Sequence, residues 1–210
     1  TFLNVLRTAG IQAIYPLNIG DLCCGLTFSS KGLERPALQA AIQATEMLWL
    51  ASEDGRIPIV MDTSPCTYHM KHYGKILQGE HLKKWQNLMI LDISEFLHDY
   101  VMTRIRHSPM KGKAILHPTC STIKMGLETK MLKVARSCSE EAEFPEDTGC
   151  CAFAGDRGLF FPELTASATK IEANSVHNCT NGSAGYYSSS RMCEVSLSKA
   201  TGESYSSIVY

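Results

Sequence analysis

Stretches with the apolar spacing of a helix alternate with short apolar runs along most of the chain. Residues 2–9 and 36–51 place their apolar side chains on one face of a helix, and Gly10 is suited to end the first of these helices. Residues 57–61 form a short apolar run that is typical of a buried strand. Residues 21–32 are rich in cysteine, glycine and serine, so we expect a loop there.

The remaining pattern predicts further elements of both kinds. Helices are expected over residues 93–105, 122–138 and 162–176. Strands are expected over residues 12–16, 88–91, 113–116, 142–144 and 186–187. This alternation predicts an α/β fold with short, mainly parallel sheets flanked by helices, and with cysteine motifs on loops at the strand ends.

The order of these elements repeats along the chain. Each half is expected to run through a helix, a strand, a Cys-Cys pair, a helix and a strand that ends near a single cysteine. We therefore expect two similar units, residues 1–112 with a connecting segment and residues 113–210.

Composition narrows the class of protein. The chain has 210 residues, 44% of them hydrophobic, and a net charge of −1, which indicates a globular protein without the basic field that nucleic acid requires. No apolar run is long enough to span a bilayer. The first residues have the periodicity of a helix interior and lack a signal peptide's apolar stretch, so we expect a fragment of a longer protein. Nine cysteines, an odd number, favour a reducing cytoplasm over a disulfide framework.

Six of the nine cysteines follow one rule, in which an adjacent pair is followed 42 residues later by a single cysteine. The two sets are Cys23, Cys24 and Cys66, and Cys150, Cys151 and Cys193. One offset of 127 residues relates all three positions of the first set to those of the second. Packing alone gives no reason for this register, whereas a site assembled from separate loops does.

A seventh cysteine, Cys120, follows an expected strand in the run His117-Pro-Thr-Cys120 and gives the second half four thiols. Four thiolates suit a [4Fe-4S] cluster or a tetrahedral zinc ion. The offset between the halves places the counterpart of Cys120 seven to nine residues before Thr1. We therefore expect a further cysteine in the parent protein, upstream of this chain.

Several alternatives compete with an iron–sulfur site. Adjacent side chains diverge, which favours a polynuclear cluster over a single zinc ion, but a zinc-stapled structural or docking domain remains an alternative. A dithiol–disulfide reductase that uses the adjacent pairs is another. Burial as small hydrophobic residues explains one pair better than two pairs in register. Cys138 and Cys179 have no counterpart in the other half, so we expect a core residue and a bystander thiol, respectively.

The cysteine segments together resemble the cysteine-rich CCG domain of heterodisulfide reductase B subunits, glycolate oxidase iron–sulfur subunits and lactate-utilisation proteins. The resemblance is carried by Leu22-Cys-Cys-Gly-Leu26, Asp62-Thr-Ser-Pro-Cys66, His117-Pro-Thr-Cys120 and Gly149-Cys-Cys-Ala-Phe153. The later run Ala154-Gly-Asp-Arg-Gly158, with Pro162-Glu-Leu-Thr165 and Arg191-Met-Cys-Glu194, is most similar to the C-terminal part of FAD-linked D-lactate dehydrogenases.

This resemblance implies an electron-transfer domain of a larger oxidoreductase. Cys120, Cys150, Cys151 and Cys193 would hold one [4Fe-4S] centre, and Cys23, Cys24, Cys66 and the upstream cysteine would hold the other. The implied partners are the protein's own FAD and ferredoxin-like domains, which would precede this chain, and a quinone or cytochrome acceptor. The implied location is the cytoplasm, with peripheral contact at the inner face of the membrane. The fragment itself is not expected to be catalytic.

The chain departs from the family's five-cysteine pattern at three positions. His69 and Ser196 stand where the final Cys-x-x-Cys motif has its second cysteine, and Ala152 stands where the pattern has glycine. These changes move the prediction from five-thiolate clusters and heterodisulfide chemistry toward four-ligand centres. His69 is a candidate fourth ligand in the first half, and a surface histidine is the alternative.

Three polar residues near the cysteines are further candidates. Asp156 and Arg157 follow the second Cys-Cys pair, and Arg157 is suited to balance the negative charge of a thiolate cluster. A turn in which these two side chains pair with each other is the alternative. His117 is a candidate support for Cys120, or a structural histidine at a strand end. No glycine-rich nucleotide-binding motif is present in the chain.

Overall fold

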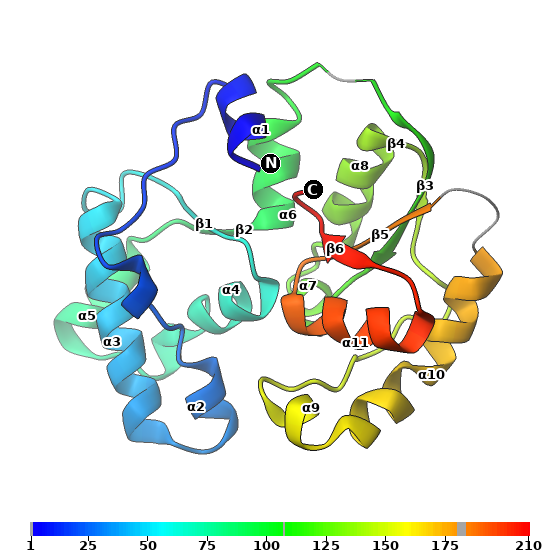
Figure 1. The fold of residues 1–210 in the computed structure, drawn as a ribbon. Coiled ribbons are helices and arrows are strands. Elements are labelled where there is room, and N and C mark those ends of the chain that lie inside the picture. Colours follow the sequence, from blue (N-terminus) through cyan, green and yellow to red (C-terminus); the bar gives the residue numbers. More distant parts are fainter. Residues whose placement is uncertain (1, 107, 180–183) are drawn as a thin grey trace.

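Two parallel sheets organise the computed structural model, which describes residues 2–106, 108–179 and 184–210. The smaller sheet has two strands, β1 (Ile59–Met61) and β2 (Ile90–Asp92), and the larger has four strands in the order β4-β3-β5-β6. Every strand pair in these sheets is parallel, and helices cover the sheets (Figure 1). The predicted α/β class is confirmed.

The chain forms the smaller sheet first. Its first segment contains α1 (Phe2–Thr8), η1 (Ile19–Asp21), α2 (Leu26–Ser30), α3 (Glu34–Ala51), β1, α4 (Ser64–Met70), η2 (Tyr73–Lys75), α5 (Gly79–Gln86), β2, α6 (Ile93–Phe96) and the π-helix η3 (Leu97–Val101). Ala41, Ala44 and Leu48 of α3 pack against β1 and the α4–η2 segment, because these apolar residues recur on one helix face.

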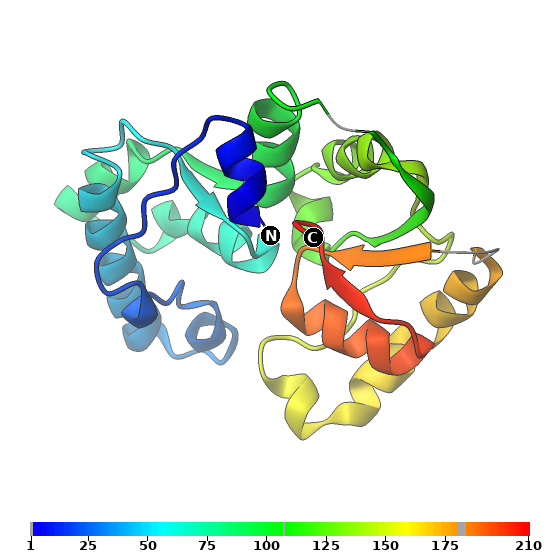
Figure 2. The same cartoon turned by 45° about the horizontal axis from the view of Figure 1, so that its top comes forward.

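The larger sheet follows along the chain. Its elements are β3 (Met110–His117), α7 (Cys120–Lys124), α8 (Glu128–Cys138), β4 (Ser139–Glu143), α9 (Arg157–Phe160), α10 (Pro162–Cys179), β5 (Ala184–Ser188), α11 (Arg191–Thr201) and β6 (Tyr205–Ser207). Figure 2 shows β3, β5 and β6 lying side by side, in agreement with the strand pairing. Ile115 of β3 and Leu197 of α11 are fully buried between the sheet and its helices.

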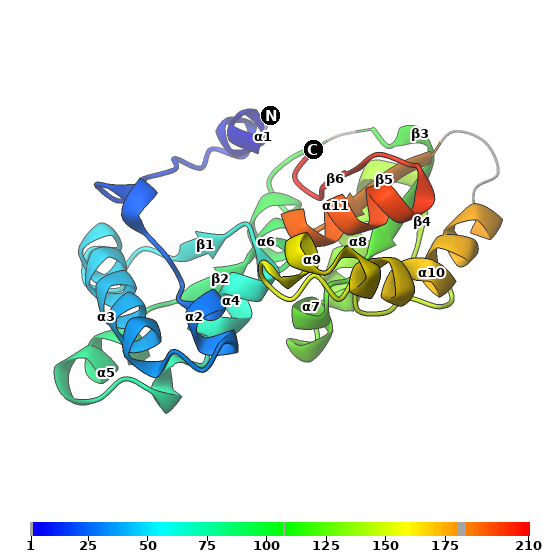
Figure 3. The same ribbon diagram turned by 60° about the horizontal axis from the view of Figure 1, so that its bottom comes forward.

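The elements of the two sheets meet at α4 and α7, which pack against each other (Figure 3). The backbone N–H of Ser64 donates to the carbonyl of Ser189 at 3.0 Å, and its hydroxyl donates to the Ser189 hydroxyl at 2.7 Å. The Thr122 hydroxyl of α7 lies 3.1 Å from the same Ser189 hydroxyl oxygen. These buried hydroxyls join the end of β5 to the first turns of α4 and α7.

Several predicted elements are confirmed and others are wrong. The helix expected from residue 36 begins two residues earlier in α3, and the strands expected over 57–61 and 113–116 are β1 and β3 with shifted ends. Residues 12–16 are not a strand, because they pair with none of the described strands. The expected helix over 122–138 is two helices, α7 and α8, interrupted at Gly126, which has a φ of +67°.

Two other expectations need correction. The expected loop over 21–32 contains the short helix α2. The helix expected over 93–105 ends at η3, at Val101. Helix α5 and strand β6 were not expected. Among the described residues, no helix combines the length and apolar character required to cross a bilayer.

Candidate functional site

The three single cysteines occupy equivalent places in the fold. Cys66, Cys120 and Cys193 lie in the first turns of α4, α7 and α11, which follow the carboxyl ends of β1, β3 and β5. Open parallel sheets bind ligands at these ends, and the N-terminal turn of a helix stabilises a thiolate. Local sequence supports the geometry, since the Thr119 hydroxyl caps α7 by accepting from the backbone N–H of Thr122.

The two Cys-Cys segments adopt the same turn. Gly25 and Ala152, which are related by the 127-residue offset, both have left-handed backbone conformations, with φ of +77° and +52°. Their N–H groups donate to the sulfurs of Cys23 and Cys150 at the same distance, 3.4 Å. The register in the sequence therefore corresponds to a repeated backbone structure.

Sulfur atoms meet in pairs across these turns. The Sγ atoms of Cys24 and Cys66 lie 3.1 Å apart, and those of Cys151 and Cys193 lie 2.9 Å apart. Cys120 and Cys150 are near enough for each thiol to shift the pKa of the other. The fold thus brings two of the four predicted thiols of the second half, and two of the three predicted thiols of the first half, into direct contact.

Cys150 has the most acidic thiol of the second half. The interaction with the Cys120 thiol lowers the pKa of Cys150 to about 5, and the Ala152 N–H and the charge of Lys124 act in the same direction. The same interaction raises the pKa of Cys120. Cys150 is therefore the thiolate of this pair at neutral pH, and thiolate is the form that binds metals.

The other two pairs share the same asymmetry. The hydrogen bond with Cys193 lowers the pKa of Cys151 to about 7, and the hydrogen bond with Cys66 lowers the pKa of Cys24 to about 7. The pKa of each partner, Cys193 and Cys66, is raised in turn by the same bond and by burial. Each of these pairs therefore gains a negative charge near neutral pH.

The contacting thiols supply the donor chemistry of a metal centre, but their positions fit neither a zinc ion nor an iron–sulfur cluster without a change. Among the described residues, no three His, Cys, Asp or Glu side chains are grouped as they would be around one metal ion. Two thiolates on one tetrahedral zinc lie about 3.8 Å apart, since each Zn–S bond is about 2.3 Å. The 2.9 Å contact of Cys151 with Cys193 is shorter, so this pair would have to open to bind a metal. A polynuclear cluster holds its thiolates on separate irons, so the pair would have to open for a cluster as well.

Two positions next to the single cysteines hold buried polar atoms that have no hydrogen-bond partner in the described part of the chain. These atoms are Nε2 of His69, three residues after Cys66, and Oγ of Ser196, three residues after Cys193. Burial lowers the pKa of His69, which favours its neutral, metal-binding form. The unpaired Nε2 of His69 is compatible with a role as a metal ligand beside the cysteines of the first half.

The acidic and basic residues after the second Cys-Cys pair link the two turns. Asp156 accepts from Nζ of Lys31, which follows α2, at 2.6 Å. The alternative in which Asp156 pairs with Arg157 is not what the structure shows, because Lys31 occupies the carboxylate and lowers the pKa of Asp156. Arg157 begins α9 with its side chain exposed, on the loop that carries Cys150 and Cys151.

Glu172 is a site residue that the sequence did not reveal. It lies on α10, is 2% exposed, and its Oε1 lies 2.7 Å from Nδ1 of His117 at the end of β3. The other oxygen accepts from the N–H of Gly149, next to Cys150, at 3.2 Å. A glutamate within a helix gives no local signal of this role, because the contact joins residues 55 apart.

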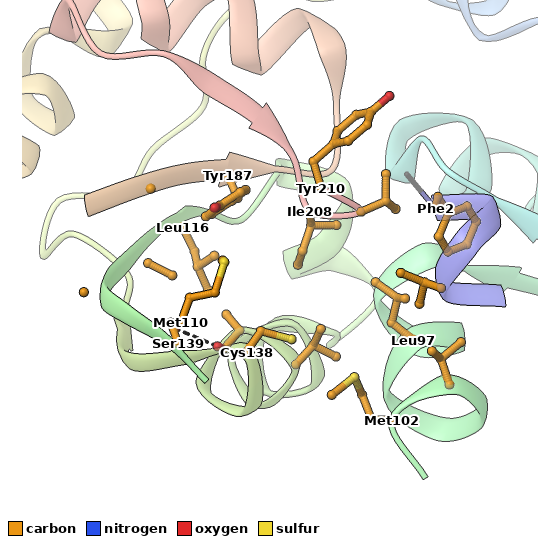
Figure 4. Close-up of a pocket in the computed structure, with 18 of the residues that line it drawn as sticks. Phe2, Leu97, Met102, Met110, Leu116, Cys138, Ser139, Tyr187, Ile208 and Tyr210 are labelled. Atoms are coloured by element: carbon orange, nitrogen blue, oxygen red, sulfur yellow. Dashed lines mark hydrogen bonds between the residues drawn. The ribbon is translucent and has the colours of Figure 1, made fainter. Parts of the chain in front are cut away.

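Cys138 and Cys179 lie apart from the predicted ligands. Cys138 ends α8 and lines an apolar cavity of about 520 Å³, together with Leu116, Tyr187 and Ile208 (Figure 4). Cys179 ends α10 and packs beside the buried cluster of the larger sheet. None of the seven predicted ligand cysteines lines the cavity, so it is separate from the cysteine site.

No family model matches the chain. The chain is 23% identical over 183 residues to Lactate utilization protein A of Oceanobacillus iheyensis, and the match covers 83% of this chain and 71% of that protein. It is 24% identical over 164 residues to one subunit of the anaerobic glycerol-3-phosphate dehydrogenase of Escherichia coli K12, where the match covers 75% of this chain and 39% of that polypeptide. At this low identity, both matches are consistent with the CCG-type domain that the cysteine motifs resemble.

Proposed function

We propose that this chain is a cysteine-rich, iron–sulfur electron-transfer domain of an oxidoreductase. The observation that carries the proposal is the repeated arrangement of thiols at the ends of parallel strands, with contacts at 3.1 Å and 2.9 Å at equivalent positions. Similarity to proteins named for lactate utilization and for anaerobic glycerol-3-phosphate dehydrogenase supports the same class.

In this proposal the second centre is held by Cys120, Cys150, Cys151 and Cys193. A bound iron–sulfur cluster would accept and release single electrons there. The protein contributes thiolates at low pKa, a backbone N–H from Ala152 to the Cys150 sulfur, and partial burial. Hydrogen bonds to cluster sulfurs and limited exposure to water are the means by which a protein sets a reduction potential.

Cys23, Cys24 and Cys66 would hold the first centre, with a cysteine upstream of Thr1 or with His69 as the remaining donor. Helix α4, which carries Cys66, packs against α7, which carries Cys120, so the two proposed centres would lie at the same interface. This proximity supports electron transfer between them, and residues 1–112 and 113–210 would be the two repeats.

The finer assignment is to the C-terminal part of an FAD-linked D-lactate, or other 2-hydroxy acid, dehydrogenase. Electrons would then leave the flavin, pass through a ferredoxin-like domain to this one, and reach a quinone or cytochrome on the cytoplasmic side of the membrane. The motif Ala154-Gly-Asp-Arg-Gly158 supports this assignment.

A dithiol–disulfide module is the second candidate, because one observation favours it. The contacts of Cys24 with Cys66 and of Cys151 with Cys193 place free thiols close together, each with one partner of lowered pKa. Loss of two hydrogens from either pair to an added disulfide oxidant would form a bond between the two sulfurs and release two thiols from the oxidant. The zinc-stapled domain is the remaining alternative, and no specific contact of the described residues favours it.

Anaerobic reconstitution with iron and sulfide tests the proposal. We expect broad visible absorption that bleaches on reduction, together with an EPR signal from the reduced centre. Cys150→Ser should lose the second centre, whereas the matched variant Cys138→Ser should retain it. Tight zinc binding without a colour change in iron and sulfide would contradict the proposal. Reversible oxidation of Cys151 and Cys193 without cluster assembly would favour the dithiol candidate.

A further inference from the structure

A buried histidine–glutamate pair lies beside the second cysteine centre. His117, the last residue of β3, is 0% exposed, and Glu172 of α10 is 2% exposed. Nδ1 of His117 lies 2.7 Å from Oε1 of Glu172, and the second carboxylate oxygen accepts from the N–H of Gly149. Since the carboxylate accepts on both sides, Nδ1 carries the proton of this hydrogen bond.

The opposite ring nitrogen of His117 has no partner among the described residues. Nε2 is buried and makes no hydrogen bond there, although burying an unpaired polar atom is unfavourable. His117 stands three residues before Cys120, and its partner Glu172 also accepts from Gly149, the residue before Cys150. The unpaired nitrogen therefore belongs to the same part of the fold as the second centre.

Protonation at Nδ1 leaves Nε2 with a lone pair. A histidine that binds a metal through one nitrogen typically donates its other N–H to a carboxylate, which fixes the tautomer and orients the ring. His117 and Glu172 have this arrangement without a metal in place. Gly149 extends the arrangement, because its N–H ties the same carboxylate to the segment that carries Cys150.

We infer that Nε2 of His117 is a nitrogen ligand of the second centre, oriented by Glu172. This inference rests on the proposed function and adds a fifth donor to the thiols of Cys120, Cys150, Cys151 and Cys193. Ser196 stands where the family's pattern has a cysteine. In this inference His117, at the end of β3, supplies the donor that this cysteine would otherwise provide. A neutral imidazole as the fifth donor leaves the centre less negative than a fifth thiolate would, which raises its reduction potential.

Histidine labelled with ¹⁵N in the reconstituted wild-type chain provides the test. Pulsed EPR of the reduced cluster should show a nitrogen hyperfine coupling that changes on replacement of ¹⁴N by ¹⁵N. His117→Asn should abolish this coupling, because the asparagine amide can replace Nδ1–H as the donor to Glu172 but offers nothing at the place of Nε2. Because His69 is a candidate donor of the first half, the comparison is made in a His69→Gln background, and His177→Gln, a change at an exposed histidine of α10, is the matched control that should retain the coupling.

The outcomes separate the inference from the function. A cluster that assembles without any histidine coupling, or with a coupling that persists in His117→Asn on the His69→Gln background, overturns the ligand assignment and leaves the electron-transfer proposal standing. A coupling lost only in His69→Gln also overturns it. If no cluster assembles in the wild-type chain, the proposed function fails and the ligand assignment fails with it. Labelled wild type needs no substitution, so a variant that does not fold leaves the first comparison intact.

Discussion

At the residue scale, the two Cys-Cys turns differ at one position, where the backbone of Ala152 is strained and that of Gly25 is not. Ala152 has a φ of +52° at the position that Gly25 occupies, with a φ of +77°, in the first Cys-Cys turn. A side chain in the left-handed region costs about 1–2 kcal/mol, and glycine avoids this cost. The N–H of Ala152 donates to the Cys150 sulfur, so the strained conformation preserves this hydrogen bond to the thiol.

Ala152→Gly should therefore stabilise the reduced protein by about 0.5–1 kcal/mol, after allowing for the greater freedom of glycine in the unfolded chain. Urea unfolding under reducing conditions measures this free energy. The reciprocal variant Gly25→Ala should destabilise it, because the new Cβ would lie 3.1 Å from Cβ of Ala40 and 3.2 Å from the Ala37 carbonyl. Equal stability of wild type and Ala152→Gly would show that the turn is not strained.

Glu172→Ala should lower the free energy of unfolding by about 3 kcal/mol, because it removes the buried acceptor of both His117 and the Gly149 N–H. Lys170→Ala, an exposed change on the same helix, should shift the same free energy by less than about 0.5 kcal/mol. A similar small effect for Glu172→Ala in urea unfolding would show that the buried pair contributes little.

At the element scale, ion pairs stabilise the packing of helices whose positions the apolar pattern predicts only approximately. Asp99 of η3 pairs with Lys130 of α8, and the neighbouring His98 Nδ1 lies 2.6 Å from the same carboxylate. The hydrogen bond from Lys130, followed by that from His98, lowers the pKa of Asp99 below its ordinary value of 3.8. This pair holds η3 against α8, between the elements of the two sheets.

Asp99→Asn should reduce stability by about 0.5 kcal/mol at pH 6, since the pair is partly exposed. The folded-state pKa is lowered, so the contribution is present above pH 3.8 and is lost as the pH falls through the folded-state value. Thermal unfolding of both proteins from pH 6 to pH 3 should show a difference that shrinks with acidification. A difference that grows toward low pH would contradict this assignment.

At the scale of the whole molecule, a few buried hydroxyls join the two sheets. Ser189 receives the backbone N–H and the hydroxyl of Ser64 and lies 3.1 Å from the Thr122 hydroxyl. Apolar packing also spans the junction, since Leu6 of α1, Leu91 of β2 and Val134 of α8 share one core cluster. The two repeats that the sequence predicts are therefore physically coupled.

Ser189→Ala should lower the free energy of unfolding by about 2 kcal/mol, because Ser64 then keeps a buried hydroxyl without its acceptor. Both tryptophans, Trp49 and Trp85, lie in α3 and α5 beside the smaller sheet. Tryptophan fluorescence should therefore detect the loss of stability, although Ser189 follows β5 of the larger sheet. The fluorescence transition should coincide with the circular dichroism transition. Ser167→Ala, an exposed change, is the control. A fluorescence transition unaffected by Ser189→Ala would show that the sheets unfold independently.

The sequence by itself determined the α/β class, the main helices and the register of the cysteines, because apolar periodicity and fixed spacing are local properties. It did not determine where helices break, since Gly126 interrupts a helix whose apolar pattern continues. Only the tertiary structure decided which thiols meet, that Lys31 rather than Arg157 pairs with Asp156, and that His117 pairs with Glu172 beside the second Cys-Cys segment. These contacts join residues far apart in the chain. They depend on how the helices connect the parallel strands in space, and no local sequence pattern shows that arrangement.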